Sequence, residues 1–183
     1  MAIPALATPR LILRAFAKED VDPMHQILGG EGVLRYFPPT DPPSRDRVQR
    51  MILGILRHWD EHGYGLWAVE SRSDGELMGR CGLQHLAELD EVEVDFILGR
   101  AFWGQGLGTE AARASVRYGF EKLALARVVG IAHVENKASQ RVLEKVGMAL
   151  VERQEFFGIP CYRYAVERPT FDEVSASWES APR

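Results

Sequence analysis

The sequence predicts a protein of the α/β (α+β) class, with strands and helices in the order β-α-α-β-β-β-α-β-α-β-β. Short apolar runs bounded by turn residues indicate the strands, and longer segments whose apolar residues recur at helical spacing indicate the helices. The turn Ser73-Asp74-Gly75 lies between two such runs and is typical of a hairpin. At 183 residues the chain is long enough for one buried core, because single domains commonly have about 100–200 residues.

The first elements are a strand over residues 10–16 and a short helix over 19–28, which ends at a pair of glycines. The segment 36–43 is expected to be a loop, because its prolines lack the amide donor and restrict the residue before each of them. Ser44 then caps a longer helix that ends near Gly63. Since loops often shape a site, the proline-rich loop is a candidate for contact with substrate.

The remaining elements alternate strands and helices up to a second hairpin. They are strands over 66–70, 77–83 and 91–98, a helix after a glycine-rich loop, a strand over 128–134, a helix over 136–146 closed by Gly147, and two strands at 156–157 and 162–166 around the turn 158–160. In the tail over 167–183, Phe171 and Val174 recur at helical spacing, and this tail is either docked on the domain or disordered.

The composition argues against two classes of protein. The formal net charge of −4 and the sequence pI near 5.8 do not suit a nucleic-acid binder, which normally presents a basic face, and they do suit a cationic or amine substrate. No apolar run approaches the ~18–20 residues of a membrane span, so we expect a soluble protein. The two cysteines, Cys81 and Cys161, are expected to be buried free thiols of a reduced cytoplasmic protein, and the amino terminus lacks the pattern of a signal segment.

The most informative segment is 100–112, in which Gly104, Gly106 and Gly108 stand between an extended apolar stretch and a helical one. Because glycine has no Cβ, the backbone here can turn several amide N–H groups in one direction and approach a ligand closely. The helix that follows adds unpaired N–H groups and the positive end of its dipole. The loop is therefore a candidate site for a phosphate or pyrophosphate, and the alternative is a tight turn that binds nothing.

Two other phosphate-binding motifs fit this segment poorly. The run 106–111 matches G-x-G-x-x-A, but several residues separate it from the strand that ends at Leu98, and too little chain follows for a doubly wound domain. A nucleoside-triphosphate loop ends in Gly-Lys-Ser/Thr, whereas this chain has Gly-Thr-Glu at 108–110. The missing lysine argues against phosphoryl transfer.

Two blocks of the sequence resemble the GNAT superfamily of N-acetyltransferases. In the first, Phe-Trp-Gly-Gln-Gly-Leu-Gly-Thr-Glu-Ala over 102–111, Gly106 and Gly108 occupy the two small positions of the family's acyl-coenzyme A motif, and Trp103 stands where the family usually has Gln or Arg. This form looks like the branch that includes the ribosomal-protein alanine N-acetyltransferases. The second block, within 136–148, resembles the family's N-x-x-S-x-x-V-L-E-K-x-G-F. The resemblance covers a domain over 8–166 and leaves out the tail over 167–183.

The resemblance implies the GNAT fold, with a mixed and mostly antiparallel central sheet flanked by helices. It implies an acyl-CoA-dependent N-acetyltransferase that moves an acetyl group from acetyl-CoA, as co-substrate, to a primary amine such as a protein amino terminus or a small amine. Direct attack in a ternary complex needs no metal and no acyl-enzyme, and neither cysteine lies in a nucleophile motif. The partners implied are acyl-CoA and the amine acceptor, and a homodimer is one assembly that the sequence leaves open.

The resemblance also assigns residues to the cofactor. Amides of the glycine loop would bind the pyrophosphate, and the strand around Ile97 would pair with the pantetheine arm like an added strand. Asn136 either contacts that arm or only caps the helix that it opens. The binding residues implied are Phe96, Ile97, Leu98, Gln105, Gly106, Leu107, Gly108, Thr109, Asn136 and Ser139.

The catalytic residues that the resemblance implies depart from the common pattern. Leu143 stands where many family members place the tyrosine that acts as general acid. Ser139, one turn into the same helix, therefore becomes the candidate proton donor, with a cofactor contact as its alternative role. Glu93 matches a recurrent strand glutamate of the family and is a candidate base. Glu155 resembles another glutamate, proposed as base in the alanine-acetylating branch.

Glu91, Glu93 and Asp95 alternate along one strand and project to one face, which is either a solvated face or the wall of a cleft. In a cleft, mutual repulsion and partial burial would raise the pKa of at least one of them. Asp95 falls where the family usually has glycine. It either binds a cationic substrate or disturbs the family's pattern.

His58 and His62 lie four residues apart on a predicted helix, a spacing that suits either a metal or a surface pair. No third ligand is apparent, and His85 at a strand end is a further candidate member of the site. Two functional alternatives stay open. One is a family member that binds acyl-CoA as a sensor without turnover, and the other is an enzyme that uses a different acyl-CoA, such as succinyl-CoA.

Overall fold

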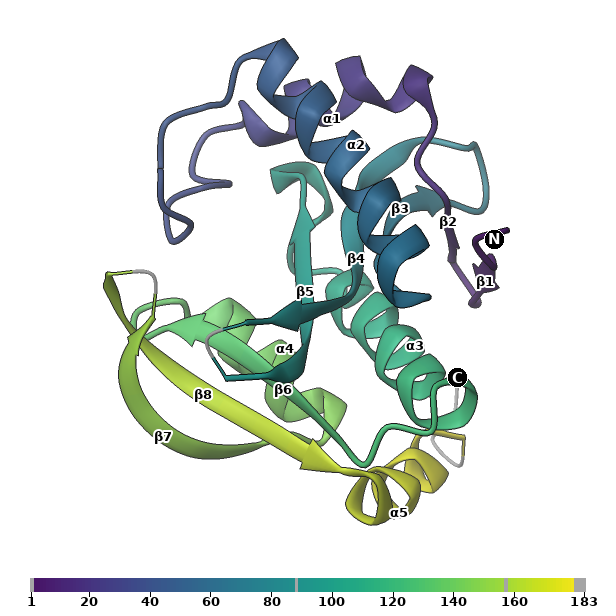
Figure 1. The fold of residues 1–183 in the computed structure, drawn as a ribbon, viewed down its shortest axis with the longest axis vertical. Helices are drawn as coiled ribbons and strands as arrows, with labels where there is room; N and C mark the ends of the chain where they lie inside the picture. Colours follow the sequence, from purple (N-terminus) through teal and green to yellow (C-terminus); the bar gives the residue numbers. More distant parts are fainter. Residues whose placement is uncertain (1, 88, 157, 180–183) are drawn as a thin grey trace.

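The structure, a computed structural model, describes residues 2–87, 89–156 and 158–179. Its strands form one eight-stranded sheet in the order β1-β2-β3-β4-β5-β6-β8-β7 (Figure 1). The strands are β1 (Leu6–Ala7), β2 (Leu11–Arg14), β3 (Leu66–Ser71), β4 (Leu77–Leu86), β5 (Glu91–Leu98), β6 (Arg127–His133), β7 (Ala149–Phe156) and β8 (Ile159–Glu167). The helices are α1 (Val21–Leu28), α2 (Arg45–His62), α3 (Leu107–Lys122), α4 (Lys137–Val146) and α5 (Arg168–Glu179).

The sheet is mixed. Among the described strands, β5 and β6 run parallel, and every other neighbouring pair runs antiparallel. The turn at 72–76 joins β3 to β4 as a hairpin, and β7 and β8 form a second, long and curved hairpin (Figure 1). The mixed, mostly antiparallel sheet that the sequence predicts is therefore confirmed.

The sheet opens between β5 and β6. These two strands share one register pair, Glu93 with Val129. Beyond it, β5 remains fully paired with β4 on its other side, up to Leu98 opposite Gly79. Past Glu93, the second edge of β5 therefore has no neighbouring strand among the described residues.

The helices pack on this sheet through a continuous apolar core. α3 lies along β4 and β5 and beside α4, and α1 and α2 lie together (Figure 1). Aromatic rings join the layers, because Trp67 of β3 lies edge-on to Trp59 of α2 and to Tyr118 of α3, with ring centroids 4.9 and 5.2 Å away. Trp59 and Trp67 donate their indole N–H groups to the carbonyls of Leu66 and Pro4, so neither ring buries an unpaired donor.

Local signals explain where the longer helices begin and end. The Ser44 hydroxyl accepts from the amide of Arg47 at 3.3 Å and caps α2, which ends at Gly63 with a left-handed φ of 74°. Gly147 closes α4 in the same way with φ 99°. The sequence predicts both helices within one residue of their observed ends, since caps and terminal glycines mark them.

Two strands differ from the sequence prediction. β1 was not predicted, because two residues are too few to show a periodicity, although Leu6 pairs with Leu13 of β2. β7 begins at Ala149, whereas the sequence predicts a strand only at 156–157, and of that pair Phe157 lies outside the described residues. Most of β7 is exposed on both faces, so its sequence lacks the alternation that marks a half-buried strand.

The described part of the tail packs on the domain as α5. Phe171 is 2% exposed, and its ring lies 4.9 Å from that of Phe120 in α3. Val174 lies against Gly147, where a Cβ would come within 3.1 Å of its side chain. Residues 180–183 of the expected tail lie outside the described residues.

Candidate active site

The loop between β5 and α3 presents a row of free amides. Gly104 and Gly106 both adopt left-handed backbone, with φ of 75° and 78°, which favours glycine. No main-chain N–H from Gly104 to Thr109 donates to another described residue, and the bond from Glu110 N–H to the Gly106 carbonyl, 3.0 Å, is the first of α3. Free N–H groups that follow one another at a helix amino terminus form a site that can bind an anion.

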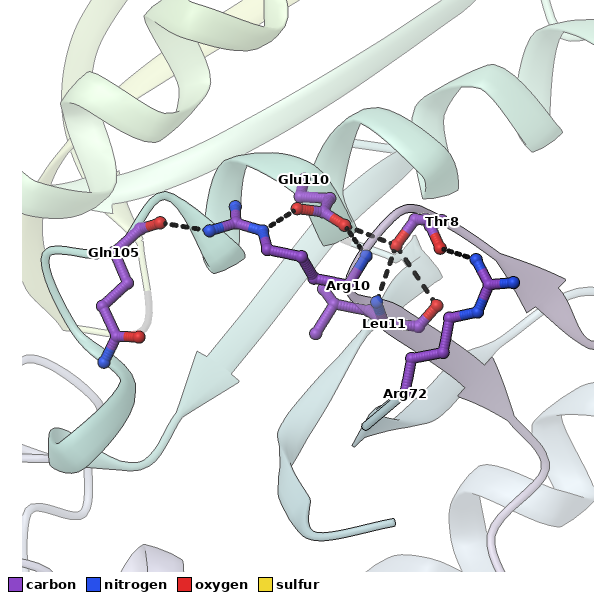
Figure 2. Close-up of polar contacts among 6 residues, drawn as sticks. All are labelled: Thr8, Arg10, Leu11, Arg72, Gln105 and Glu110. Carbon is purple, nitrogen blue, oxygen red and sulfur yellow. Dashed lines mark hydrogen bonds and ion pairs between the residues drawn. The ribbon is translucent and has the colours of Figure 1, made fainter. Parts of the chain in front are cut away.

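Arg10 lies just before β2, far from this loop in the sequence but beside it in the structure, and braces it (Figure 2). Its Nη1 donates to the carbonyl of Gln105 at 2.9 Å, and its Nε donates to Glu110 Oε2 at 2.7 Å. The bond to the carbonyl holds the Gln105–Gly106 peptide by its oxygen, so the Gly106 N–H of the same planar peptide points the opposite way. Arg10 therefore fixes the loop at the residue that starts the expected pyrophosphate site.

Glu110, in the first turn of α3, joins this brace to the chain start (Figure 2). Its Oε1 accepts from the Thr8 hydroxyl at 2.6 Å and from the Arg10 main-chain N–H at 2.8 Å. Burial acts to raise the pKa of Glu110, but the hydrogen bonds from Thr8 and Arg10 outweigh it and lower the pKa below its ordinary value. The carboxylate stays ionised and also complements the positive end of the helix.

The open edge of β5 carries the strand residues that the sequence assigns to the pantetheine arm. Ile97 and Leu98 are buried, and Phe96 is half-buried. The Leu98 carbonyl already accepts from the indole N–H of Trp103 at 2.8 Å, a contact that the sequence does not reveal. Trp103 itself is 48% exposed and stands at the mouth of the glycine loop.

A cavity of about 270 Å³ occupies the opening between β5 and β6. It collects residues from five parts of the chain, namely the 36–43 loop, β4, β5, β6 with the start of α4, and β8. The lining consists of Tyr36, Phe37, Pro38, Arg80, Gln84, Glu93, Val94, Asp95, Phe96, Ile131, Ala132, His133, Asn136, Ser139, Ile159 and Cys161. The cavity therefore brings together Glu93, Phe96, Asn136 and Ser139, which the sequence assigns to the site.

Glu93 is the buried acid of this cavity. Glu93 is 6% exposed, and its Oε2 accepts a hydrogen bond from Gln84 Nε2 at 3.0 Å. Burial and the charge of Asp95 raise the pKa of Glu93 to about 8, although Gln84, the main chain of Ile131 and Arg80 lower it. A carboxyl group with a pKa near neutrality can exchange a proton with substrate, as a general base must.

Asp95 is paired with Arg80 of the adjacent strand. Arg80 Nη1 donates to Asp95 Oδ2, and the two side chains are 13% and 10% exposed. The Nε of Arg80 is buried without a hydrogen-bond acceptor. The sequence does not predict this pair, because the two residues stand in different rows of the β4–β5 ladder, Arg80 opposite Ile97 and Asp95 opposite Gly82.

Glu91, the third acid of the strand, has a structural role. Its oxygens lie 3.0 Å from Arg127 Nε and 2.8 Å from Arg163 Nη1, and Arg163 also contacts Glu152 at 2.7 Å. These ion pairs tie β5 to β6, β7 and β8. Of the three alternating acids, Glu93 and Asp95 therefore line the cavity, and Glu91 does not.

The start of α4 closes the cavity on another side. Asn136 Oδ1 accepts from the Ser139 N–H at 3.1 Å, so Asn136 caps the helix and lines the cavity at once. Leu143 is 1% exposed and packs over Gly130, so it belongs to the core. Tyr36 begins the 36–43 loop, which the sequence makes a candidate for contact with substrate; it lines the cavity and stacks on His133 with ring centroids 5.0 Å apart.

Other candidates lie outside this cavity. Glu155 is exposed on β7 and is not among the described residues of the lining. His58 binds the carbonyl of Tyr64 through Nδ1 at 3.1 Å and accepts from the His85 N–H through Nε2 at 3.2 Å, so it links α2 to β4. His62 lies between the rings of His58 and His85. The described residues include no group of three or more side chains placed to hold a metal.

Both cysteines are free and buried, as the sequence predicts. Burial raises the pKa of Cys161, which lines the cavity, to about 11, and raises that of Cys81 to about 12. Neither thiol is therefore ionised near neutral pH, which makes both poor nucleophiles. None of the helices in the described part of the chain combines the length and the apolar character that a membrane span requires.

Comparison with known proteins identifies relatives of this chain. Residues 10–149 match the family model described as an acetyltransferase (GNAT) domain. An uncharacterized N-acetyltransferase of Bacillus subtilis (strain 168), YoaA, is 30% identical over 145 residues, which cover 79% of this chain and 82% of the relative. The spermidine N(1)-acetyltransferase of Escherichia coli (strain K12) is 29% identical over 176 residues, 93% of this chain and 90% of the relative.

The fold agrees with this assignment. The crystal structure of an acetyltransferase from Agrobacterium tumefaciens str. C58 superposes with a TM-score of 0.80 at 24% identity, covering 92% of this chain and 96% of that chain. The family model spans both the glycine loop and the start of α4, where the sequence blocks lie. The chain belongs to the GNAT family of acetyltransferases.

Proposed function

We propose that the protein transfers the acetyl group of acetyl-CoA to a primary amine by direct attack within a ternary complex. One observation carries this proposal: the free amides from Gly104 to Thr109 lie at the end of the open strand that leads to the buried carboxyl of Glu93. Family membership supports acyl-CoA as the donor.

In this proposal the pyrophosphate lies on the amides of Gln105, Gly106, Leu107, Gly108 and Thr109, which have no other acceptor among the described residues. The pantetheine arm runs along the open edge of β5 at Phe96 and Ile97, with Asn136 on its other side. Since Trp103 already binds the Leu98 carbonyl, Leu98 contributes its side chain rather than that oxygen.

The chemistry needs a neutral amine and an exit for the thiolate. Ionised Glu93 accepts a proton from the substrate ammonium, and the amine nitrogen attacks the thioester carbonyl carbon. The C–N bond forms and the C–S bond breaks. The CoA thiolate takes up a proton from Ser139, which lines the cavity, and Ser139 regains one from the nitrogen, which loses its second proton as it becomes an amide. The high thiol pKa of Cys161 favours direct transfer over an acyl-enzyme.

The test is calorimetric titration with acetyl-CoA and CoA, followed by thiol release with a panel of primary amines. Gly106→Ala should raise the dissociation constant at least about tenfold, because φ near 78° strains any Cβ and the loop would rearrange. Gly75→Ala is the matched control, with φ 77°, open space around it and a place in a distant turn. Equal dissociation constants for wild type and Gly106→Ala would refute the loop assignment, and binding without turnover of any amine would favour the sensor alternative.

A further inference from the structure

A second cavity of about 260 Å³ lies beside the first. The two share Phe37, Pro38 and Arg80 in their walls, so one loop and one guanidinium separate them. The second cavity extends under the 36–43 loop toward α1 and α2. Its apolar lining includes Leu28, Leu34, Phe37, Val48, Met51 and Ile97.

The two cavities differ in their charged side chains, although Arg80 lines both. The second cavity has Arg47 and Arg80 against one carboxylate, Asp41, and no ion pair among the described residues joins Arg47 to Asp41. In the first cavity the acids are Glu93 and Asp95 on β5. A ligand that spans both cavities would therefore have Glu93 beside one end and the apolar lining of the second cavity around the other, with the Arg80 guanidinium between them.

Arg80 is placed to hold an anion between them. Its Nη1 is engaged by Asp95, whereas Nε and Nη2 have no acceptor among the described residues. Guanidinium groups bind carboxylates through two nitrogens at once, so one residue can serve Asp95 and a ligand carboxylate together. Arg127 and Arg163 also have a buried Nε that makes no hydrogen bond, but of these three arginines only Arg80 lines the cavities.

We propose that the amine acceptor is an apolar α-amino acid. Its amine lies beside Glu93, its carboxylate binds Arg80, and its side chain enters the second cavity. The proposal rests on the acetyl transfer proposed above: the amine nitrogen bonds to the acetyl carbon and the C–S bond breaks. Glu93 takes one proton of the ammonium, the second passes to the CoA thiolate, and the products are an N-acetyl amino acid and CoA.

Two other acceptors fit the charges less well. A linear polyamine would place a second ammonium in a hollow lined by apolar side chains and by two arginines, with Asp41 as the one carboxylate of the described lining. A peptide amino terminus would offer Arg80 a neutral carbonyl in place of a carboxylate, and hydrogen bonds to charged groups are the stronger ones.

The first experiment compares four acceptors with the wild-type protein under saturating acetyl-CoA: leucine, leucinamide, 3-methylbutylamine and 1,5-diaminopentane. Leucine should exceed 3-methylbutylamine in kcat/KM by about ten- to a hundredfold, the effect of one charge-assisted contact. Across glycine, alanine and leucine, kcat/KM should rise by about fourfold for each methylene that enters the apolar cavity.

The second experiment uses Arg80→Lys, which keeps a charge beside Asp95 but loses the second nitrogen. We expect the preference for leucine over 3-methylbutylamine, taken as the ratio of their kcat/KM values, to fall about tenfold. Arg57→Lys is the matched control, because Arg57 is exposed on α2 and lines neither cavity. Binding of leucine to the protein–CoA complex, measured by calorimetry, gives the same comparison without turnover.

The outcomes separate the two proposals. Acetyl-CoA binding with leucinamide or the diamine as the best acceptor would overturn the amino-acid assignment and leave acetyl transfer standing. An unchanged leucine preference in Arg80→Lys would overturn the role of Arg80. Failure to bind acetyl-CoA at all would overturn both.

Discussion

Glu93 shows how far burial changes one side chain. The carboxyl group lies at the point where β5 and β6 separate, with one hydrogen bond from Gln84 and the charge of Asp95 nearby. Its pKa of about 8 means that the group is mostly protonated at neutral pH and becomes a base as the pH rises. The same burial that weakens its ionisation makes it able to exchange a proton with an amine.

Replacement of this group should slow the reaction. We expect Glu93→Gln to lower kcat by about 10²–10⁴-fold, the usual effect of losing a general base, and to abolish the rise of kcat toward pH 8. A pH–rate profile of thiol release measures both. Glu155→Gln is the control, and a large loss there with a normal Glu93→Gln would move the base to the β7–β8 hairpin.

The same substitution should change how stability depends on pH. Because the pKa of Glu93 is about 8 in the folded protein and 4.5 as its ordinary value, the folded state holds this proton over a range where the unfolded chain has lost it. Folding stability should then fall as the pH rises through that range, by up to about 1.4 kcal/mol per pH unit. Urea unfolding of wild type and Glu93→Gln from pH 5 to 9 isolates this contribution. Plots of the free energy of unfolding against pH that run parallel for the two proteins would contradict it.

The sequence alone predicted Glu93 as a member of the site, since its strand alternates acids and the family pattern marks its position. It did not predict that Arg80 pairs with Asp95. That contact depends on a register between two strands and on a side chain that crosses from one row to the next. Residue type and spacing along one strand carry no information about either.

The glycine loop, as an element, depends on the short segment between β1 and β2. Arg10 reaches the Gln105 carbonyl, 95 residues away, and Glu110 ties the first turn of α3 to Thr8 (Figure 2). The motif predicts which amides are free but not what holds them. A brace between distant segments leaves no periodic signal in the sequence.

Loss of the brace should weaken cofactor binding more than stability. We expect Arg10→Met to raise the dissociation constant for acetyl-CoA by about tenfold, the value of one lost hydrogen bond, because the Gln105 peptide becomes free to turn. Since Arg10 is half exposed, the free energy of unfolding should change by less than about 1 kcal/mol. Arg72→Met, which loses only a bond to the Thr8 carbonyl, is the control and should bind normally. Equal binding by both variants would show that the loop holds its shape without Arg10.

Elements bounded by helix caps, terminal glycines or turn residues can be predicted from the sequence, and elements without such residues cannot. Caps and glycines marked α2 and α4, and a turn marked the β3–β4 hairpin. β7 was predicted only at its end because its side chains are exposed on both faces. The sequence does not decide whether the tail that contains α5 docks on the domain or is disordered. Helical spacing shows which residues share a face, but not whether the domain offers a surface for that face.

Across the domain, residues near both ends of the described chain take part in the packing: Ile3 packs against the core and Phe171 belongs to it. Pro4 accepts the indole N–H of Trp67, and Phe171 of α5 packs against Phe120. The packed structure therefore extends past both limits of the domain expected over 8–166. The cavity residues lie elsewhere, so stability and ligand binding can be tested separately.

Truncation of Phe171 should destabilise the fold without touching the site. We expect Phe171→Ala to lower the free energy of unfolding by about 3–5 kcal/mol, as for other buried aromatic side chains. The dissociation constant for acetyl-CoA should stay unchanged wherever the variant is folded. Urea denaturation measures the loss, and Thr170→Ala, exposed on the same helix, should stay within about 0.5 kcal/mol of wild type. A loss of similar size in both variants would contradict the docking of α5 through Phe171.

The opening between β5 and β6 has a consequence for the lifetime of the protein. If the pantetheine arm of acetyl-CoA pairs with the open edge of β5, the bound cofactor completes the sheet. The free energy of binding acetyl-CoA then adds to the free energy of folding. At a concentration 100 times the dissociation constant, this adds about 2.7 kcal/mol. Amide exchange along β5 and turnover by proteases would then slow as acetyl-CoA accumulates, so the abundance of the protein would follow the supply of its own donor.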